Sequence, residues 1–516
     1  MRITLYDYAY ETFAVQFLAS NLKKHGFDTE VFYDCSMNKD YLGEDFFLTS
    51  FFSLSPEQAA DGILNTNPDV VGFSVLTVYY PQLKKIIRRI KEIKPEITVL
   101  CGEPHATLAP THLLKNPDID FIFLGDADIS LPSFLKELAS NPRDELKTYP
   151  AEKMPGVANM RGEAVALRGL GPILKNLDEA PFPEKEAYYK KNPSLKILYT
   201  TICSRGCIYK CTYCNSSTLR KIYRENDQNY FRMRSVDNVI EELKEAKEKY
   251  RPWYVMFIDN LFAPKKEWLK EFADKYKREI NLPYFCETNP NVHSDETLEL
   301  LAYSGCKIVQ FGFQSASEEV RREILHRPET NMRIRRIVKK AKELGIFVCI
   351  DHIANLPGEK KEHIDEALEL YRELRPNWIN LGFLQYYPKA DIVEIAIAKK
   401  AIEKTAVPLI FRGERQTSFR LLSKSGLGDE YRTLPIRFFI ISKLPLWMQK
   451  PALKMVEYPL FVKLYSPFAS FFLYGTRIFY SFTDRRDFLV RHHIIRNLYV
   501  MRTILIEKFA GYGRHT

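Results

Sequence analysis

The chain contains 516 residues, 46% of them apolar and 27% charged, which is an ordinary globular composition and excludes a disordered or fibrous protein. This length predicts two to four domains, each able to bury its own core. The net charge of +10 is uneven, because residues 401–516 hold 19 Lys and Arg against 8 Asp and Glu, whereas residues 1–400 hold 56 against 57. The basic excess is therefore C-terminal and needs its own explanation.

Residues 1–140 alternate apolar runs with amphipathic stretches, which predicts a doubly wound, Rossmann-like parallel sheet. The expected strands are Arg2–Tyr6, Asp28–Tyr33, Val70–Val75, Ile97–Cys101 and Phe121–Leu124, and the expected helices include Gln82–Ile93 and Leu131–Leu138. Ligands of such sheets bind at the carboxyl ends of the strands. The segments expected there are Asp7–Thr12, Ser74–Pro81, Gly102–Pro110 and Gly125–Ser130. Spacing alone predicts only a nucleotide-like site.

Motifs in the same region carry a resemblance to a known domain. They are Pro68–Ser74, Gly102–Thr107, Asp118–Phe121 and Gly125–Asp128, and together they resemble the cobalamin-binding domain that precedes many radical S-adenosylmethionine domains. The family shows a second glycine where Glu103 stands and glutamates where Asp126 and Asp128 stand. The resemblance implies cobalamin contacts from Tyr8, Ser74, Thr77, Tyr79, Gly102, Pro104, His105 and Gly125.

The cobalt of that cofactor is expected to have no histidine ligand from the protein. The Asp-x-His-x-x-Gly motif, which supplies such a ligand in methionine synthase-type domains, does not occur in the sequence. We expect His105 to pack or hydrogen-bond near the corrin instead. The alternative is a Rossmann-like domain that holds no cofactor.

Residues 141–195 are rich in Pro and Gly and include Pro181–Glu184, a loop signature without a packed period. We expect a connector between two domains, with little chemistry of its own.

Three cysteines stand close together in the run Ser204–Asn215. Cys207, Cys211 and Cys214 have the spacing Cys-x3-Cys-x2-Cys, and three thiolates leave one iron of a [4Fe–4S] cluster open to a small molecule. This loop closely resembles that of the radical S-adenosylmethionine superfamily, in which the open iron chelates S-adenosylmethionine. Cys203 supplies a fourth thiol, so a structural zinc site is the alternative. The four cysteines fall within twelve residues, which is closer than zinc sites usually space their ligand pairs, so the spacing favours the cluster.

Residues 196–395 again alternate strand and helix. The expected strands are Ile197–Thr201, Tyr254–Ile258, Tyr284–Thr288, Ile308–Phe313, Phe347–Ile350 and Trp378–Phe383. The expected helices are Val236–Tyr250, Lys266–Tyr276, Asp295–Tyr303, Glu318–Leu325, Asn331–Leu344 and Lys361–Leu374. Six such units are too few for an eight-stranded barrel, but they match the superfamily's partial (βα)6 TIM-type barrel. The cysteine loop follows the first strand, at the barrel end where reactive groups gather.

Residues at other strand ends match the S-adenosylmethionine contacts of the family. The resemblance places Asp259 against the methionyl amine, through a charge-assisted hydrogen bond. It places Thr288 and Asn289 at the end of the third strand, and Gln314 and Ser315 in the ribose-contact segment after the fourth. Each match is weak by itself, but their order and spacing together are specific.

Residues 396–516 interleave aromatic and aliphatic residues with Lys and Arg, and we expect a mostly helical C-terminal domain. Prolines and charges interrupt the apolar runs, so no stretch of about 18 uncharged apolar residues appears and a membrane span is not expected. Basic, aromatic-rich segments suit contact with anionic lipid at a membrane surface. A helical subdomain that covers the open barrel is equally compatible. Nucleic acid is not expected as a partner.

Together these features predict a cobalamin-dependent radical S-adenosylmethionine enzyme with a [4Fe–4S] cluster. The resemblance implies a radical that abstracts hydrogen from an unactivated carbon and cobalamin that supplies a methyl group. It also implies an electron donor of the flavodoxin or ferredoxin type. The basic, apolar tail favours a lipid, terpenoid or tetrapyrrole-like substrate.

Two alternatives remain, a radical oxidoreductase or cyclase without working cobalamin, and a zinc-binding, membrane-docked scaffold. Nine scattered cysteines favour a reducing compartment, and the first residues read as a strand and not as a signal peptide. We therefore expect a cytoplasmic protein, with peripheral contact at the inner face of the membrane.

Overall fold

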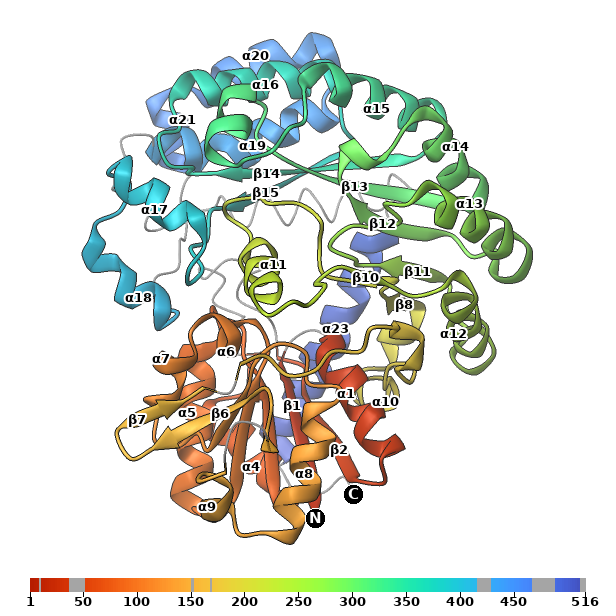
Figure 1. The fold of residues 1–516 in the computed structure, drawn as a ribbon. Helices are drawn as coiled ribbons and strands as arrows, with labels where there is room; N and C mark the ends of the chain where they lie inside the picture. Colours follow the sequence, from red (N-terminus) through yellow and green to blue (C-terminus); the bar gives the residue numbers. More distant parts are fainter. Residues whose placement is uncertain are drawn as a thin grey trace.

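The computed structural model describes residues 1–8, 11–36, 52–149, 153–167, 169–414, 428–465 and 488–510. Two sheets dominate the molecule, and in Figure 1 the N-terminal sheet lies below the second sheet, with α11 (Asn215–Glu225) between them. The C-terminal helices lie around both sheets. The site therefore forms where two separately built α/β units face each other.

The first sheet is the expected doubly wound sheet. Its parallel strands run in the order β2-β1-β3-β4-β5, and its members are β1 (Arg2–Tyr8), β2 (Asp28–Asp34), β3 (Val70–Ser74), β4 (Thr98–Gly102) and β5 (Phe121–Phe123). The covering helices are α1 (Phe13–Lys24), α4 (Pro56–Leu64), α5 (Tyr80–Ile93), α6 (Pro104–Leu108), α7 (Pro110–Leu114) and α8 (Ser130–Ser140). Four of the five strands are buried over most of their length, as continuous apolar runs predict for a sheet covered on both faces.

The segment 141–195 contains more structure than a loop signature suggests. After α9 (Arg143–Leu146), a hairpin of β6 (Val157–Arg161) and β7 (Ala164–Ala166) extends the first sheet antiparallel to β5. Further along, Lys185 is buried and donates to Thr200 Oγ1 at 2.9 Å and to Glu11 at 3.4 Å. The segment also contains η2 (Leu177–Glu179), which precedes Lys185, and α10 (Glu186–Lys191) and η3 (Pro193–Ile197), which follow it. This segment therefore packs against both units.

The second sheet is the expected six-stranded partial barrel. Its strands are parallel in the order β15-β14-β13-β12-β11-β8, and they are β8 (Leu198–Thr201), β11 (Tyr254–Phe257), β12 (Tyr284–Thr288), β13 (Cys306–Gln314), β14 (Phe347–Ala354) and β15 (Trp378–Phe383). The outer helices are α12 (Val236–Tyr250), α13 (Lys266–Lys275), α14 (Asp295–Ser304), α15 (Asn331–Glu343) and α16 (Lys361–Leu374). The α-helix expected over Glu318–Leu325 is instead a π-helical turn, η6 (Val320–Ile324).

A short antiparallel ribbon connects the cysteine loop to this sheet. It consists of β9 (Ser204–Arg205) and β10 (Arg232–Met233). The cysteines and α11 lie between these two strands in the sequence, so the pairing of β9 with β10 brings the two ends of this segment together.

The C-terminal domain is helical over its described residues, as expected. Its helices are α17 (Asp391–Ala398), α18 (Val407–Phe411), α19 (Gly428–Lys443), α20 (Leu446–Val456), α21 (Pro459–Tyr465) and α23 (Phe488–Ala510), with the turn η7 (Lys404–Ala406). In α19, Phe438 packs on His352 of β14 and Tyr371 of α16, so this helix lies beside α16 on the outer, helix-covered face of the sheet. None of the described helices is both long and apolar enough to span a bilayer.

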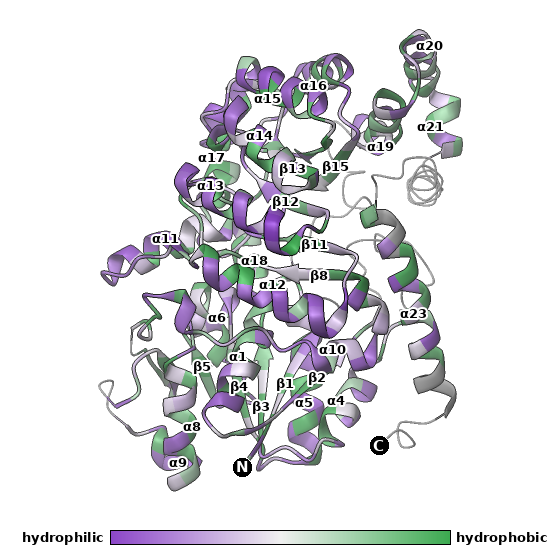
Figure 2. Ribbon diagram, turned by 90° about the vertical axis from the view of Figure 1, so that its right-hand side faces the viewer, coloured by the Kyte–Doolittle hydropathy of each residue, from purple (hydrophilic) through white to green (hydrophobic). Residues whose placement is uncertain are grey.

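Helix α23 lies at the N-terminal ends of the barrel strands and runs beside the first unit (Figure 2). Phe488 stacks on Tyr254 with ring centroids 4.0 Å apart and joins an apolar layer with Leu198, Phe285, Ile308, Phe347 and Trp378. Farther along, His492 Nε2 lies 3.1 Å from the carbonyl oxygen of Ser194. The helix therefore links the barrel floor to the connector.

We predict that Phe488→Ala lowers the free energy of unfolding by about 3–5 kcal/mol, the usual cost of truncating a buried phenylalanine. Chemical denaturation followed by tyrosine and tryptophan fluorescence measures the change. Leu498→Ala on the same helix is the matched control, because Leu498 is 60% exposed and should change stability by less than about 0.5 kcal/mol. Equal effects from both variants would contradict this packing role.

Candidate functional site

The cysteine loop is held rigidly at both ends. Gly206 has φ 84°, and a Cβ there would lie 2.4 Å from the carbonyl oxygen of Tyr230, so only glycine fits this turn before Cys207. Within the loop, Thr212 N and Oγ1 donate to the carbonyl oxygens of Leu325 and Ile324 at 3.2 and 2.6 Å. Three thiols on a loop this well anchored fit the ligation of one [4Fe–4S] cluster.

Cys203 is separated from that set. It lies at the end of β8 with no exposed surface, and the charged groups around it are Asp259, Arg234 and Glu242. Its neighbours are therefore barrel residues, whereas those of Cys207 include Cys214 and Cys211. This arrangement favours the three-cysteine cluster over a four-cysteine zinc site.

Asp259 lies just beyond β11, at the entrance to the loop. Its carboxylate accepts the backbone N–H of Cys203 at 3.0 and 3.1 Å and the Ser204 hydroxyl at 2.5 Å. Burial raises its pKa to about 6, although these hydrogen bonds oppose the increase. Asp259 therefore anchors the chain before the cysteines, and it also lines the cavity described below.

Sequence reasoning missed Arg327, which touches one of the three predicted cluster ligands. Its Nη1 lies 3.4 Å from Cys211 Sγ and 3.1 Å from the Tyr213 hydroxyl, and its Nη2 donates to Glu329 at 2.6 Å. A buried guanidinium beside a thiolate stabilises the negative charge of the sulfur. The loop that carries Arg327 has no motif, and the contact spans 116 positions, so no sequence signal indicated it.

The predicted residues at the ends of β12 and β13 point in different directions. Thr288 contacts His293 Nε2 at 2.8 Å, whereas Asn289 donates to Glu329 at 2.6 Å and so joins the Arg327 network. Gln314 has φ 72° and follows a register shift in β13, and the hydroxyl of Ser315 accepts the N–H of Ser317. Asn289 is therefore linked to the cysteine loop through Arg327, while the Thr288 hydroxyl contacts His293 in the segment before α14.

Two carboxylates that sequence reasoning missed face the inside of the barrel. Burial and repulsion by Asp351 raise the pKa of Glu287 to about 8, and burial raises that of Asp351 to about 6. Asp351 is held by Gln310 and Asn380 at 3.2 and 3.1 Å, whereas within the described chain the Glu287 carboxylate makes no hydrogen bond. An ammonium group is the counter-ion that these two acids lack, so they could hold the amine of S-adenosylmethionine.

A cavity of about 390 Å³ connects the carboxyl ends of the first sheet with the barrel mouth. Its deep wall is apolar and includes Leu5, Gly72 and Leu100, and its far rim includes Ser204, Asp259 and Asn260. A Cβ on Gly72 would lie 2.7 Å from Leu5 Cδ2, so the glycine leaves room at the sheet surface. An apolar recess that opens to a polar rim at strand ends fits part of a large cofactor such as cobalamin.

The residues expected to contact cobalamin fall into two groups. Those that line the cavity are Ser74, Gly102, Pro104 and Gly125, and those outside its lining are Tyr8, Thr77, Tyr79 and His105. Tyr8 packs edge-on against Tyr79 at 5.1 Å, and Thr77 Oγ1 lies 3.1 Å from His105 Nδ1. Burial lowers the pKa of His105 to about 4, so this ring is neutral at physiological pH and packs behind the cavity wall.

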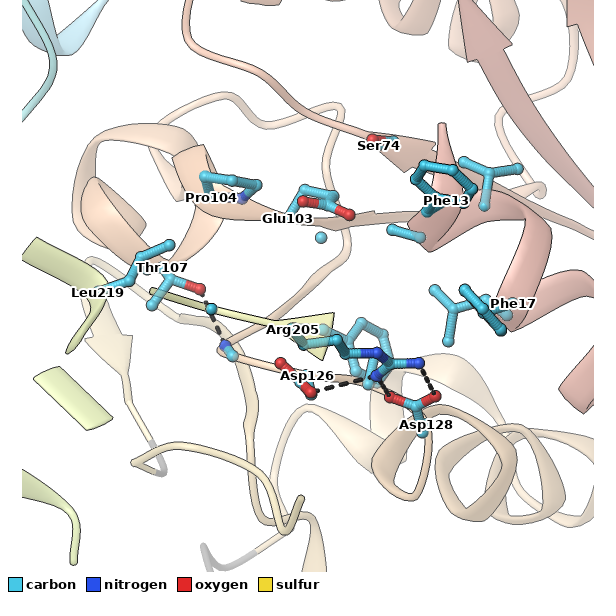
Figure 3. Close-up of a pocket in the computed structure, with 18 of the residues that line it drawn as sticks. Phe13, Phe17, Ser74, Glu103, Pro104, Thr107, Asp126, Asp128, Arg205 and Leu219 are labelled. Atoms are coloured by element: carbon cyan, nitrogen blue, oxygen red, sulfur yellow. Dashed lines mark hydrogen bonds and ion pairs between the residues drawn. The ribbon is translucent and has the colours of Figure 1, made fainter. Parts of the chain in front are cut away.

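Arg205 joins the two units at the cavity rim (Figure 3). It lies two residues before Cys207 and donates to Asp128 at 2.6 and 3.1 Å and to Asp126 at 3.2 Å. Arg232, on the paired strand β10, donates to Asp126 at 2.7 Å. Burial alone would raise the pKa of Asp126, but the two arginines outweigh it and the pKa lies below its ordinary value.

Comparisons with known proteins agree with both halves of this site. Residues 3–135 match the B12 binding domain model and residues 201–371 match the Radical SAM superfamily model. The cytidylyl-2-hydroxyethylphosphonate methyltransferase of Streptomyces wedmorensis is 25% identical over 472 residues, which cover 82% of this chain and 84% of that protein. The anaerobic magnesium-protoporphyrin IX monomethyl ester cyclase of Rubrivivax gelatinosus is 22% identical over 394 residues, which cover 74% of this chain and 65% of that protein.

A solved structure shows the same fold over nearly the whole chain. The cobalamin-dependent S-adenosylmethionine radical enzyme OxsB, with aqua-cobalamin bound, superposes with a TM-score of 0.64 at 12% identity. The match covers 99% of this chain and 80% of that one.

The fold and site define an enzyme in which a cofactor-binding α/β domain faces a radical-generating partial barrel. The chain belongs to the radical S-adenosylmethionine enzymes that carry a cobalamin-binding domain. Its cofactors are accordingly a [4Fe–4S] cluster, S-adenosylmethionine and cobalamin.

We predict that Cys207→Ala, Cys211→Ala and Cys214→Ala each abolish the cluster, whereas Cys203→Ala retains it. Anaerobic purification followed by iron and sulfide analysis measures this, with about four irons per chain expected for the wild type and for Cys203→Ala. Loss of metal from all four variants, with zinc in the wild type, would instead support the zinc site.

Proposed function

We propose that this enzyme transfers a methyl group to an unactivated carbon of a hydrophobic substrate. The observation that carries the proposal is the cavity, because one space touches the strand ends of the cobalamin-binding domain and the residues that lead into the cysteine loop. When bound, the cluster with S-adenosylmethionine supplies one-electron chemistry and cobalamin supplies a methyl group. A shared cavity would let both act on one substrate.

The residues of the chain act mainly by positioning. Asp259 and Gly206 fix the start of the cysteine loop, and Arg327 contacts the Cys211 sulfur. Arg205 holds the same loop against the cobalamin-binding domain. Fixed geometry of this kind lowers the entropy cost of bringing separate reactants together. An electron donor of the flavodoxin or ferredoxin type would reduce the cluster.

The surface of α20 and α21 supports a substrate or partner of lipid character. Six of its large apolar side chains are more than half exposed, and they are Leu446, Trp447, Met455, Tyr458, Leu460 and Leu464. Lys450, Lys454 and Lys463 lie among them with a single acid, Glu457. Figure 2 shows these two helices at the periphery of the molecule. Exposed tryptophan and tyrosine with lysines suit the headgroup region of an anionic membrane.

A radical cyclase or oxidoreductase is the second candidate. The similarity to the anaerobic magnesium-protoporphyrin IX monomethyl ester cyclase favours it and is also compatible with a tetrapyrrole-like substrate. The two reactions differ in what becomes of S-adenosylmethionine. Methylation consumes two molecules, one as methyl source and one as radical source.

We therefore predict that the reconstituted enzyme, reduced with dithionite in the presence of hydroxocobalamin, forms both S-adenosylhomocysteine and 5′-deoxyadenosine. Liquid chromatography with mass spectrometry measures both, and methyl-labelled S-adenosylmethionine should transfer its label to an organic-phase product. Cys214→Ala should form no 5′-deoxyadenosine. Formation of 5′-deoxyadenosine with no S-adenosylhomocysteine would favour the cyclase.

We predict that the wild type binds vesicles of phosphatidylcholine and phosphatidylglycerol (3:1) and that Trp447→Ser with Leu460→Ser weakens binding at least tenfold. The reason is that each buried apolar side chain contributes roughly 1.5–3 kcal/mol. Vesicle co-sedimentation measures the binding. Trp253→Ser is the matched control, because Trp253 is 65% exposed elsewhere, directly before β11. Equal binding to phosphatidylcholine alone would argue against an electrostatic contribution.

A further inference from the structure

Glu103 adopts a backbone conformation that side chains normally avoid. Its φ is 79° and its ψ is −176°, a region that is essentially reserved for glycine and costs free energy for any other residue. The domain's resemblance predicts glycine at this position, so the strain is particular to this chain. A strained non-glycine residue at a ligand site calls for a functional explanation.

Local structure does not use the Glu103 side chain. Glu103 is the residue before α6, but its carboxylate does not cap that helix. Among the described residues its carboxylate makes no hydrogen bond or ion pair. Arg205, whose positive charge lowers the pKa of Glu103, is engaged by Asp126 and Asp128. Neither helix capping nor a salt bridge therefore explains the residue.

The carboxylate instead lies at the cavity. Glu103 is part of the lining, and Figure 3 shows its side chain between Pro104 and Phe13. Burial and repulsion by Asp126 raise its pKa to about 7, as expected for an acid whose hydrogen-bond donors are missing. The ion pairs of Asp126 and Asp128 occupy Arg205 and Arg232, so the charge of an ionised Glu103 is not balanced by them and disfavours an anionic ligand. The missing partner is therefore a donor of hydrogen bonds that carries no negative charge.

We propose that Glu103 recognises bound cobalamin by accepting hydrogen bonds from the carboxamide groups at the edge of the corrin. Carboxamides are neutral, and each carries two N–H donors. A hydrogen bond to an ionised acceptor is stronger than one between neutral groups, and it would offset the backbone strain in the complex. The residue thus selects a corrinoid whose carboxamide has not been hydrolysed to an acid.

The test is equilibrium binding of hydroxocobalamin to the full-length chain purified without corrinoid, followed by visible absorbance. Glu103→Gly should raise the melting temperature of the corrinoid-free protein by roughly 2–4 °C, because the strain is removed. It should also weaken hydroxocobalamin binding about tenfold. Equal or tighter binding by Glu103→Gly would overturn the proposal.

A second measurement tests charge recognition directly. The probes are the separated monocarboxylic acid derivatives of cobalamin, in which one carboxamide has become a carboxylate. The wild type should bind at least one isomer at least tenfold more weakly than hydroxocobalamin, and Glu103→Gln should bind that isomer and hydroxocobalamin about equally. No discrimination by the wild type against any isomer would overturn the proposal.

Asn67→Gly is the matched control for backbone strain. Asn67 also has a positive φ, 52°, but it lies exposed on a turn of the same domain and outside the cavity lining. This variant should change the melting temperature in the same direction and leave hydroxocobalamin affinity unchanged. Weaker hydroxocobalamin binding by Asn67→Gly, equal to that of Glu103→Gly, would overturn the proposal. These readouts do not depend on methyl transfer, so they stand apart from the proposed reaction.

Discussion

The ion pairs of Arg205 hold the two halves of the active site in register. Arg205 belongs to the ribbon that precedes the cluster cysteines, and its partners Asp126 and Asp128 belong to the loop after the last parallel strand of the first sheet. Arg232, on the paired strand of the ribbon, binds the same Asp126. Removing one partner of a largely buried pair costs about 3–5 kcal/mol, because the other charge is left in a poorly solvated site. The distance between the two cofactor sites therefore depends on these contacts.

The loops at the cavity rim give the first sheet, whose fold is common, residues that are particular to this chain. The first sheet has the strand order and strand-end cavity expected of its fold. Its loops, however, carry aspartates that engage the barrel and a glutamate in a glycine-like conformation. Loops tolerate such changes because the sheet beneath them is held by a buried apolar core. Specificity can then change at the rim without loss of the fold.

The C-terminal domain contributes in two separate ways. Helices α19 and α23 are structural, since Phe438 packs beside α16 on the outer face of the barrel sheet and Phe488 completes the apolar layer at its base. Helices α20 and α21 instead leave large apolar side chains exposed among lysines. The two interpretations of the basic tail therefore concern different helices of one domain: α19 and α23 pack against the barrel, and α20 and α21 carry the surface that we propose for lipid.

The sequence by itself determined the features that depend on neighbours in the chain. The cysteine spacing and the alternation of strand and helix are local patterns, and they were enough to predict both sheets and the cofactors of the family, while the three cysteines as cluster ligands stay a prediction. Tertiary structure alone decided which side chains share a site. Arg327 reaches Cys211 across 116 positions and Arg205 reaches Asp126 across 79, and neither contact leaves a local pattern.

Tertiary structure also decided which of two adjacent strand residues faces the inside of the barrel. Thr288 was expected at the site from its place at the strand end, and that role stays a prediction, but successive side chains point to opposite faces of a sheet. Glu287 consequently faces Asp351, while the Thr288 hydroxyl contacts His293. Asp351 lies beyond the expected end of its strand, because β14 continues to Ala354. Sequence periodicity locates a strand, and only packing decides which face of it looks into the barrel.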